Sequence, residues 1–318
     1  MRSALAIFIL VLVLFEIAIL FPKNHNDEPS PKTETHSQVP SADITMVQQK
    51  MGGIHLVESQ RGNRDWELFS ESAQSYQGKS DWDLEGVKIH FYNSEVQDMT
   101  VTGKKGRIHS ESKNMRIEGK VEVSTANGYV FLAPYIEYRA SERLILCDEQ
   151  VLVRGPNEGE RRSLFLKATG MRIPVTERKM YLEKNVTGEK LFPDQKVLKF
   201  SSQRAELLSS AQTAILRGQV TIQQDLMTIK SENASFTYSE KTRLFESLDL
   251  QGKVELREQS RRALSENLKV DFVTKQFTFS GKPRLYQGDD ELIGDKIIFL
   301  DNGKRVKVEK VKARGADR

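Results

Sequence analysis

Apolar and polar positions alternate with a period of two in three short segments of the chain. Residues 117–123, 216–222 and 250–256 read IEGKVEV, LRGQVTI and LQGKVEL, so every second residue is apolar or a glycine. Such alternation is typical of a β-strand with one buried face. We therefore predict a strand over each of the three segments.

Two of these segments belong to a longer internal repeat. Residues 218–238 align with residues 252–272 without a gap at an offset of 34 residues, and Ser-Glu-Asn recurs at 231–233 and 265–267. A period of 34 is also that of a helical repeat family, but strict alternation with β-branched residues favours strands over helices. More degenerate copies of the repeat are found at 118–138 and 280–300.

The repeats predict an all-β body in which each unit adds two or three strands to a growing stack. Stacked units of this kind turn their apolar rows toward one shared interior. The recurrent glycine is expected on the inward row, at residues 119, 218 and 252. It either relieves crowding at a bend or bulge, or leaves space for a ligand between the sheets.

The first 43 residues have a different character from the body. Ala4 to Phe21 are apolar except for Glu16, and 18 helical residues span about 27 Å, so we predict a transmembrane anchor over 1–21. A cleaved signal peptide is the alternative. Glu16 either contacts another membrane helix or lies near the membrane surface. Residues 22–43 hold four of the nine prolines and are predicted to form a disordered tether.

Composition excludes several classes of function. The 48 basic and 44 acidic residues are finely interspersed, so no basic cluster indicates nucleic-acid binding. The single cysteine, Cys147, lies in an apolar strand pattern and is expected to be a buried thiol.

Candidate catalytic or metal-binding residues are scarce. The five histidines lack metal-ligand spacing, and the sequence contains no nucleophile elbow, P-loop or dinucleotide motif. Asp81, Asp83 and Glu85 imitate the opening of a calcium loop, but its twelfth position holds Tyr92 in place of an acid. We therefore predict no enzyme activity, no catalytic residues, no cofactor and no metal.

One stretch resembles a known family. Residues 66–93, WELFSESAQSYQGKSDWDLEGVKIHFYN, follow an anchor and a tether and are similar to the start of LptC, the membrane-anchored component of lipopolysaccharide export. The repeats from about 103 onward resemble both LptC and its periplasmic partner LptA, of the organic-solvent-tolerance (OstA-like) family. The chain is longer than is usual for LptC, which indicates an LptC with an LptA-like extension.

This resemblance implies an elongated, partly open β-jellyroll built from repeats of about 30 to 34 residues. The LptC-like β-domain would cover 44–155, and the LptA/OstA-like extension, continuous with it, would cover 156–318. The body would lie in the periplasm of a bacterium, on a single-pass anchor in the inner membrane. It would receive lipopolysaccharide from an inner-membrane ABC transporter with permease subunits and would pair by edge-strand augmentation with an LptA-like bridge protein.

The resemblance also implies a lipid-binding groove along the inward rows. The alternative for each residue of the rows is a dry core, in a tethered scaffold or adhesion module that binds protein only. A polysaccharide-processing enzyme is disfavoured because the repeats place their acids outward. The candidate groove residues are Ile117, Val121, Val123, Leu216, Val220, Ile222, Phe236, Tyr238, Leu250, Val254 and Leu256.

Overall fold

The computed structural model describes most of the body. The described residues are 47–60, 62–93, 95–158, 161–192, 194–208, 212–239, 241–242, 244–300, 305–310 and 312–314. The predicted anchor, the tether and Glu16 lie outside them. Within these ranges there is no helix that could traverse a bilayer.

Every regular element in the described ranges is a β-strand, which confirms the prediction of an all-β body. The strands are β1 (Val47–Gln60), β2 (Asn63–Tyr76), β3 (Asp81–Asn93), β4 (Val96–His109), β5 (Met115–Thr125), β6 (Val130–Arg139), β7 (Leu144–Arg154), β8 (Asn157–Glu158), β9 (Arg161–Arg162), β10 (Leu164–Pro174), β11 (Lys179–Leu191), β12 (Val197–Ser202), β13 (Arg204–Leu208), β14 (Thr213–Gln224), β15 (Met227–Tyr238), β16 (Phe245–Glu258), β17 (Arg261–Asp271), β18 (Gln276–Ser280), β19 (Arg284–Gln287), β20 (Asp290–Ile293), β21 (Lys296–Leu300), β22 (Arg305–Glu309) and β23 (Lys312–Arg314).

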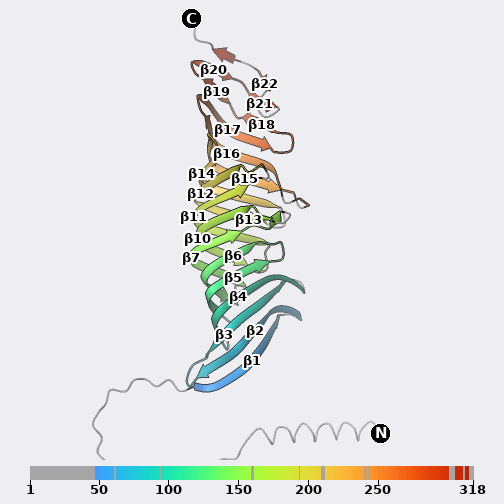
Figure 1. Ribbon diagram of the computed structural model, residues 1–318, viewed down its shortest axis with the longest axis vertical. Coiled ribbons are helices and arrows are strands. Elements are labelled where there is room, and N and C mark those ends of the chain that lie inside the picture. Colours follow the sequence, from blue (N-terminus) through green and yellow to red (C-terminus); the bar gives the residue numbers. More distant parts are fainter. Residues whose placement is uncertain are drawn as a thin grey trace, which may run out of the picture. The chain divides into compact units, whose positions relative to one another are not determined.

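The strands pair antiparallel in nearly sequential order. From β1 to β7 each strand pairs with the next, β7 pairs with β10, and the order continues through β11 to the last strands, apart from the separate β8–β9 hairpin. Figure 1 shows the resulting stack of strands rising from β1 to β22. Over the described ranges the body is therefore one sheet of 21 strands, together with the β8–β9 hairpin, in which sequence neighbours are spatial neighbours.

This sheet is folded lengthwise into two walls. The first half of β11 pairs with β13, whereas its second half pairs with β12. β14 pairs with β13 through residues 213–217 and with β12 through residues 221–223. Each long strand therefore crosses from one wall to the other at a corner near its middle. We call the wall that contains β12 the first wall, the wall that contains β13 the second wall, and the side opposite the corners the mouth.

Glycine produces several of these corners. Gly252 and Lys253 both have positive φ angles, 79° and 48°, and the pairing register of β16 with β17 shifts at this point, as in a β-bulge. A Cβ atom at Gly252 would stand 2.5 Å from Oε2 of Glu232, an exposed residue of β15. The glycine thus forms a bend. A bend is one of the two roles expected for this glycine, and the other, space for a ligand, does not hold because its free side meets a neighbouring side chain. The expectation that the glycine lies on the inward row is wrong, since that side chain, Glu232, is exposed.

Serine marks the corner on alternate strands. Ser231 in β15 and Ser265 in β17 are both buried, and each Oγ donates a hydrogen bond of 2.9 Å to the carbonyl oxygen two residues later. Ser70 and Ser202 make the same bond at 2.8 Å. The side-chain bond satisfies a carbonyl group that leaves the regular ladder, which explains the recurrence of serine.

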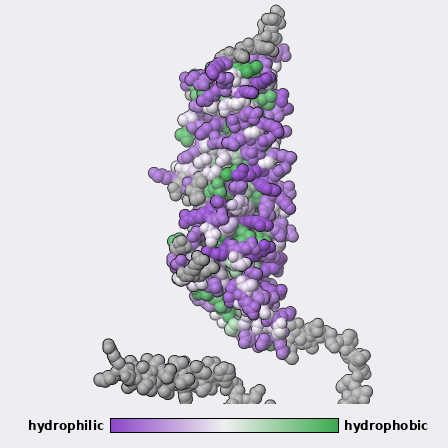
Figure 2. All heavy atoms as spheres, turned by 180° about the vertical axis from the view of Figure 1, so that it is seen from behind, coloured by the Kyte–Doolittle hydropathy of each residue, from purple (hydrophilic) through white to green (hydrophobic). Residues whose placement is uncertain are grey.

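The core lies between the two walls and extends from Trp66 to Ile297 as one contiguous cluster. Its members alternate with exposed residues along the strands, for instance at Ile117, Val121 and Val123 of β5. Figure 2 shows that the face of the body seen from behind is mostly hydrophilic, with separate hydrophobic patches. Packing between walls therefore holds the fold, as expected for a body whose single cysteine is a buried free thiol.

Candidate functional site

The predicted groove residues of β5 lie on the inner face of the sheet. Ile117 belongs to the second wall, and Val121 and Val123 belong to the first wall. All three side chains have 0% exposure. They line the interior of the half of the body nearer to β1 and do not meet the groove residues of the later strands.

The remaining groove residues come together on β14, β15 and β16, which are neighbours in the sheet. Ile222 is in register with Ile229, and Ile229 with Leu256, so these side chains form one row across the first wall. Most of the set is at most 2% exposed, Tyr238 is 8% exposed, and Leu256 is half-buried. The residues of the set are Leu216, Val220, Ile222, Phe236, Tyr238, Leu250, Val254 and Leu256.

The interior is closed in the middle of the stack. Val220 and Val254, at the corners of β14 and β16, are each 1% exposed. The ring centre of Phe200 on the first wall lies 5.8 Å from that of Phe236 on the second wall. Side chains of the two walls are therefore in contact here. A lipid chain passing through this part has to separate the walls.

The interior opens toward the C-terminal strands. A cleft of about 370 Å³ separates Met227, Leu256 and Leu285 of the first wall from Phe277 and Phe299 of the second wall. Its size falls within the usual range of small-molecule sites. The half-burial of Leu256 follows from this position, since one side of the residue faces the cleft. The edge of the cleft is polar and is formed in part by Lys196, Asp225, Glu258 and Arg261.

Aromatic rings close the mouth near that cleft. Phe192, in the turn after β11 on the first wall, lies 6.3 Å from Phe245 and 6.2 Å from Phe272 of the second wall, measured between ring centres. Lys190 is 1% exposed, donates a 2.7 Å hydrogen bond to Ser163 Oγ, and places Nζ 5.2 Å from the centre of the Phe245 ring. A buried ammonium group over a ring is stabilised by the cation–π interaction. We call Phe192, Phe245 and Phe272 the aromatic clasp.

A second contact closes the mouth in the β1-proximal half. Asp65 of β2, on the first wall, forms an ion pair with Arg143, which lies in the turn between β6 and β7 on the second wall. Arg143 also donates to the carbonyl oxygen of Tyr92 at 3.5 Å. The Asp65 pKa is raised, since burial outweighs the opposing effect of Arg143. This pair could not be predicted from the sequence, because nothing in a repeat or motif connects residues so far apart.

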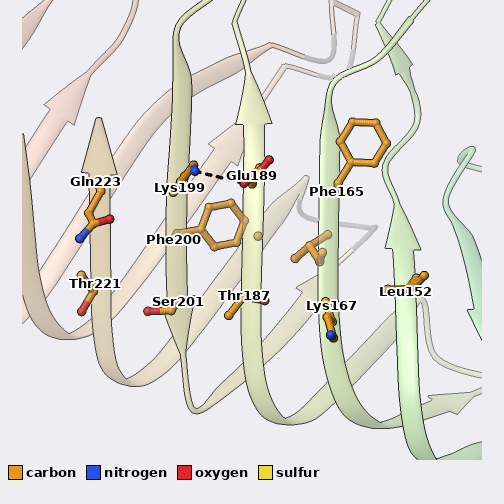
Figure 3. Close-up of a pocket in the computed structure, with 12 residues that line it drawn as sticks. Leu152, Phe165, Lys167, Thr187, Glu189, Lys199, Phe200, Ser201, Thr221 and Gln223 are labelled. Atoms are coloured by element: carbon orange, nitrogen blue, oxygen red, sulfur yellow. Dashed lines mark ion pairs between the residues drawn. The ribbon is translucent and has the colours of Figure 1, made fainter. Parts of the chain in front are cut away.

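A shallow hollow of about 450 Å³ lies on the outer face of the first wall. Figure 3 shows Lys199, Glu189 and Phe165 in one row on β12, β11 and β10, and Leu152 of β7 level with Lys167 in the next row. Phe165 and Leu152 are 45% and 42% exposed, and Lys199 pairs with Glu189 at 3.6 Å. These residues alternate with the inward rows along each strand. The lining also includes Leu166, Gly188 and Phe200, which belong to the inward row.

The described residues offer little for catalysis or metal binding. They contain no group of three His, Cys, Asp or Glu side chains that could hold a metal ion. The acids that imitate a calcium loop are engaged by cations: Asp83 pairs with Arg107 at 2.7 Å, and Glu85 with Lys105 at 3.7 Å. Burial raises the pKa of the Cys147 thiol, which disfavours the nucleophilic thiolate.

Comparison with known families gives two matches that together span most of the chain. The model described as "Lipopolysaccharide-assembly, LptC-related" matches residues 9–191. The model described as "LptA/(LptD N-terminal domain) LPS transport protein" matches residues 199–305. The end of the first match and the start of the second lie on either side of Phe192 and Lys196. No curated protein matches the chain.

Among solved structures, one similar chain is LptH from Pseudomonas aeruginosa, described as the LptA homologous periplasmic component of the conserved lipopolysaccharide transport device. It is 12% identical, with a TM-score of 0.35, over 38% of this chain and 95% of that one.

Proposed function

Because the chain belongs to the LptC-related family of lipopolysaccharide-assembly proteins, we propose that it is a non-enzymatic bridge that carries lipopolysaccharide across the periplasm toward the outer membrane. In this proposal residues 1–21 anchor the chain in the inner membrane and 22–43 tether the body to the anchor. The lipid arrives from an ABC transporter in the same membrane, whose permease subunits Glu16 could contact. The LptC-like part, 44–155, and the LptA-like extension, 156–318, form one path within an elongated, partly open β-jellyroll.

One observation carries the proposal: the antiparallel pairing is unbroken across both matched regions. β10 pairs with β7 and β11, and β11 pairs with β12 and β13, so the apolar interior continues from one region into the next. Each methylene group left in water costs about 0.8 kcal/mol, so an acyl chain of about twelve carbons needs roughly 10 kcal/mol of shelter during transfer. A continuous apolar interior supports such a role, with the groove residues as the lipid-facing rows.

The free edges of the sheet support the proposed partners. Among the described residues β1 pairs only with β2, and β22 only with β21, so both ends present unpaired backbone groups. Such edges accept a strand of another protein. We propose that the C-terminal edge, with its alternating Val306 and Val308, pairs with an LptA-like bridge protein.

A tethered scaffold that binds protein only is the second candidate. The burial of Val220 and Val254 favours it, since a dry core needs no lipid. The two functions differ in what reaches these positions in the working protein.

Photo-crosslinking in cells separates the two candidates. A benzoylphenylalanine residue at position 220 or 254 is expected to capture lipopolysaccharide, whereas the exposed position 253 serves as the matched control. Capture of protein alone, and only from position 253, would overturn the transport proposal and leave the scaffold.

A further inference from the structure

Three polar side chains meet inside the mouth of the folded sheet. Asp65 and Tyr138 are 7% and 1% exposed, and Arg143 keeps a quarter of its side chain in contact with solvent. The Tyr138 ring packs edge-to-face on Phe91 of the opposite wall, with 4.8 Å between ring centres. The cluster is therefore apolar toward the interior and reaches water only along Arg143.

This cluster has unused hydrogen-bonding capacity. Asp65 Oδ1 is the oxygen that pairs with Arg143, and the Tyr138 hydroxyl group lies within reach of both side chains. Arg143 Nε is buried and has no hydrogen-bond partner among the described residues. Buried polar atoms normally have a partner, so unsatisfied donors call for a functional explanation. Arg143 Nε can donate to an incoming acceptor, and the Tyr138 hydroxyl group can do so once Asp65 has left.

Other charges near the cluster are already paired. Glu67 accepts hydrogen bonds from Arg64 at 2.6 Å and from the Tyr92 hydroxyl at 3.1 Å, and Glu142 pairs with Arg139 at 3.4 Å. Over the described part of the chain, Asp65 is the one acid within 4 Å of Arg143. Its departure would free the guanidinium group for another anion.

We propose that Arg143 and Tyr138 form a binding site for a phosphate group of the lipid cargo, and that Asp65 occupies this site until the cargo arrives. This inference rests on the proposed function, since lipopolysaccharide supplies a phosphorylated glycolipid. Arginine binds phosphate in a bidentate, charge-assisted manner, and the phenol adds a third donor. Asp65 gains hydration when it leaves its buried position. Asp65 and Arg143 lie on opposite walls, so replacement of Asp65 by phosphate at Arg143 breaks a contact that closes the mouth.

The test measures binding of bisphosphorylated and dephosphorylated lipid A to the full-length protein in detergent. Wild-type protein is expected to favour the phosphorylated lipid by about tenfold, the strength of one charged hydrogen-bonded contact. Asp65→Asn removes the competing anion and should increase this preference. Arg143→Gln should abolish it. Arg143→Gln leaves the buried Asp65 carboxylate unpaired, which destabilises the fold. The double variant Asp65→Asn/Arg143→Gln has no such charge, so its binding of the two lipids tests the role of Arg143 in a folded protein.

Opening of the mouth has its own readout. Spin labels at Val96, beside the first-wall turn, and Glu142, in the second-wall turn, should move apart when phosphorylated lipid A is added and stay in place with the dephosphorylated lipid. The inference would be overturned if the preference for phosphorylated over dephosphorylated lipid A were the same in wild type and in the double variant. Crosslinking of lipopolysaccharide at Val254 reports the transport function separately. If wild type shows no preference for the phosphorylated lipid but crosslinking at Val254 is retained, the phosphate site is rejected and the proposed transport function stands.

Discussion

Gly252 of β16 lies directly beneath Glu232 of β15, so that a Cβ atom at the glycine would stand 2.5 Å from the carboxylate oxygen Oε2. The next residue, Lys253, pairs with the same carboxylate at 2.8 Å. Gly281 repeats the arrangement under Glu266. The Ser-Glu-Asn repeat of the sequence thus supplies the acid that covers the glycine of the following strand, and both belong to one corner.

Replacement of Gly252 by alanine is expected to destabilise the body by about 1–3 kcal/mol, because alanine adopts its φ of 79° only with strain and meets Glu232. Urea denaturation measures this loss. Gly288→Ala is the matched control, since φ there is 61° and nothing lies within 4 Å of the added atom. Equal losses in the two variants would show that Glu232 contributes nothing.

Arg143→Ala is expected to reduce the free energy of unfolding at pH 7 by about 3 kcal/mol, because Asp65 is left buried without its partner. The double variant Asp65→Asn/Arg143→Ala should regain most of this loss. Thermal or urea denaturation of wild type and both variants provides the comparison.

The Arg143→Ala loss should shrink as the pH falls toward 4. Burial raises the pKa of Asp65 in the folded state, and removal of Arg143 removes the main opposing effect. A carboxyl group with a raised folded pKa favours the folded state below its unfolded pKa, and that contribution disappears as pH rises through the folded pKa. A loss that does not depend on pH would contradict the assignment of the effect to Asp65.

Phe245→Ala is expected to cost about 2–3 kcal/mol and to loosen the aromatic clasp, because Phe245 contacts both Phe192 and Phe272 and is half-buried. Hydrogen exchange should show faster opening at the ends of β11 and β17. Leu244→Ala, at a neighbouring side chain that is 39% exposed, is the control. Unchanged exchange in Phe245→Ala would exclude a closing role for the clasp.

His90 gives a second pH-dependent prediction. Its pKa is lowered, mainly by burial and then by Lys88, while Glu67 acts in the opposite direction. The neutral ring is therefore favoured in the folded state, and its contribution to stability, present above the unfolded pKa, is lost as pH falls through the folded pKa. His90→Gln should lose less stability than wild type between pH 7 and pH 5, in paired urea titrations. Parallel curves would refute this.

Much of the fold could be predicted from alternation alone. The segments predicted as strands at 117–123, 216–222 and 250–256 lie within β5, β14 and β16. Period-two patterns report burial of one face directly, so ten of the eleven candidate groove residues are buried. Leu256 departs from the pattern because it lies where the two walls separate, and alternation carries no information on that separation.

The contacts across the mouth could not be predicted in this way. Asp65 and Arg143 belong to different hairpins, and their pairing depends on how tightly the sheet folds lengthwise. The position of the glycine was misjudged for a related reason. Gly252 and Lys253 both have positive φ and interrupt the alternation of faces along the strand. A period of two that starts at Leu250 therefore assigns Gly252 to the inward face, which is incorrect.

The repeated corner also makes the reach of the protein adjustable. Neighbouring strands in a sheet are about 4.8 Å apart, so one additional hairpin lengthens the array by roughly 10 Å. Since each long strand turns within itself, such an insertion leaves the older corners untouched. Tandem duplication of a short genetic segment is therefore sufficient to lengthen a chain of this kind.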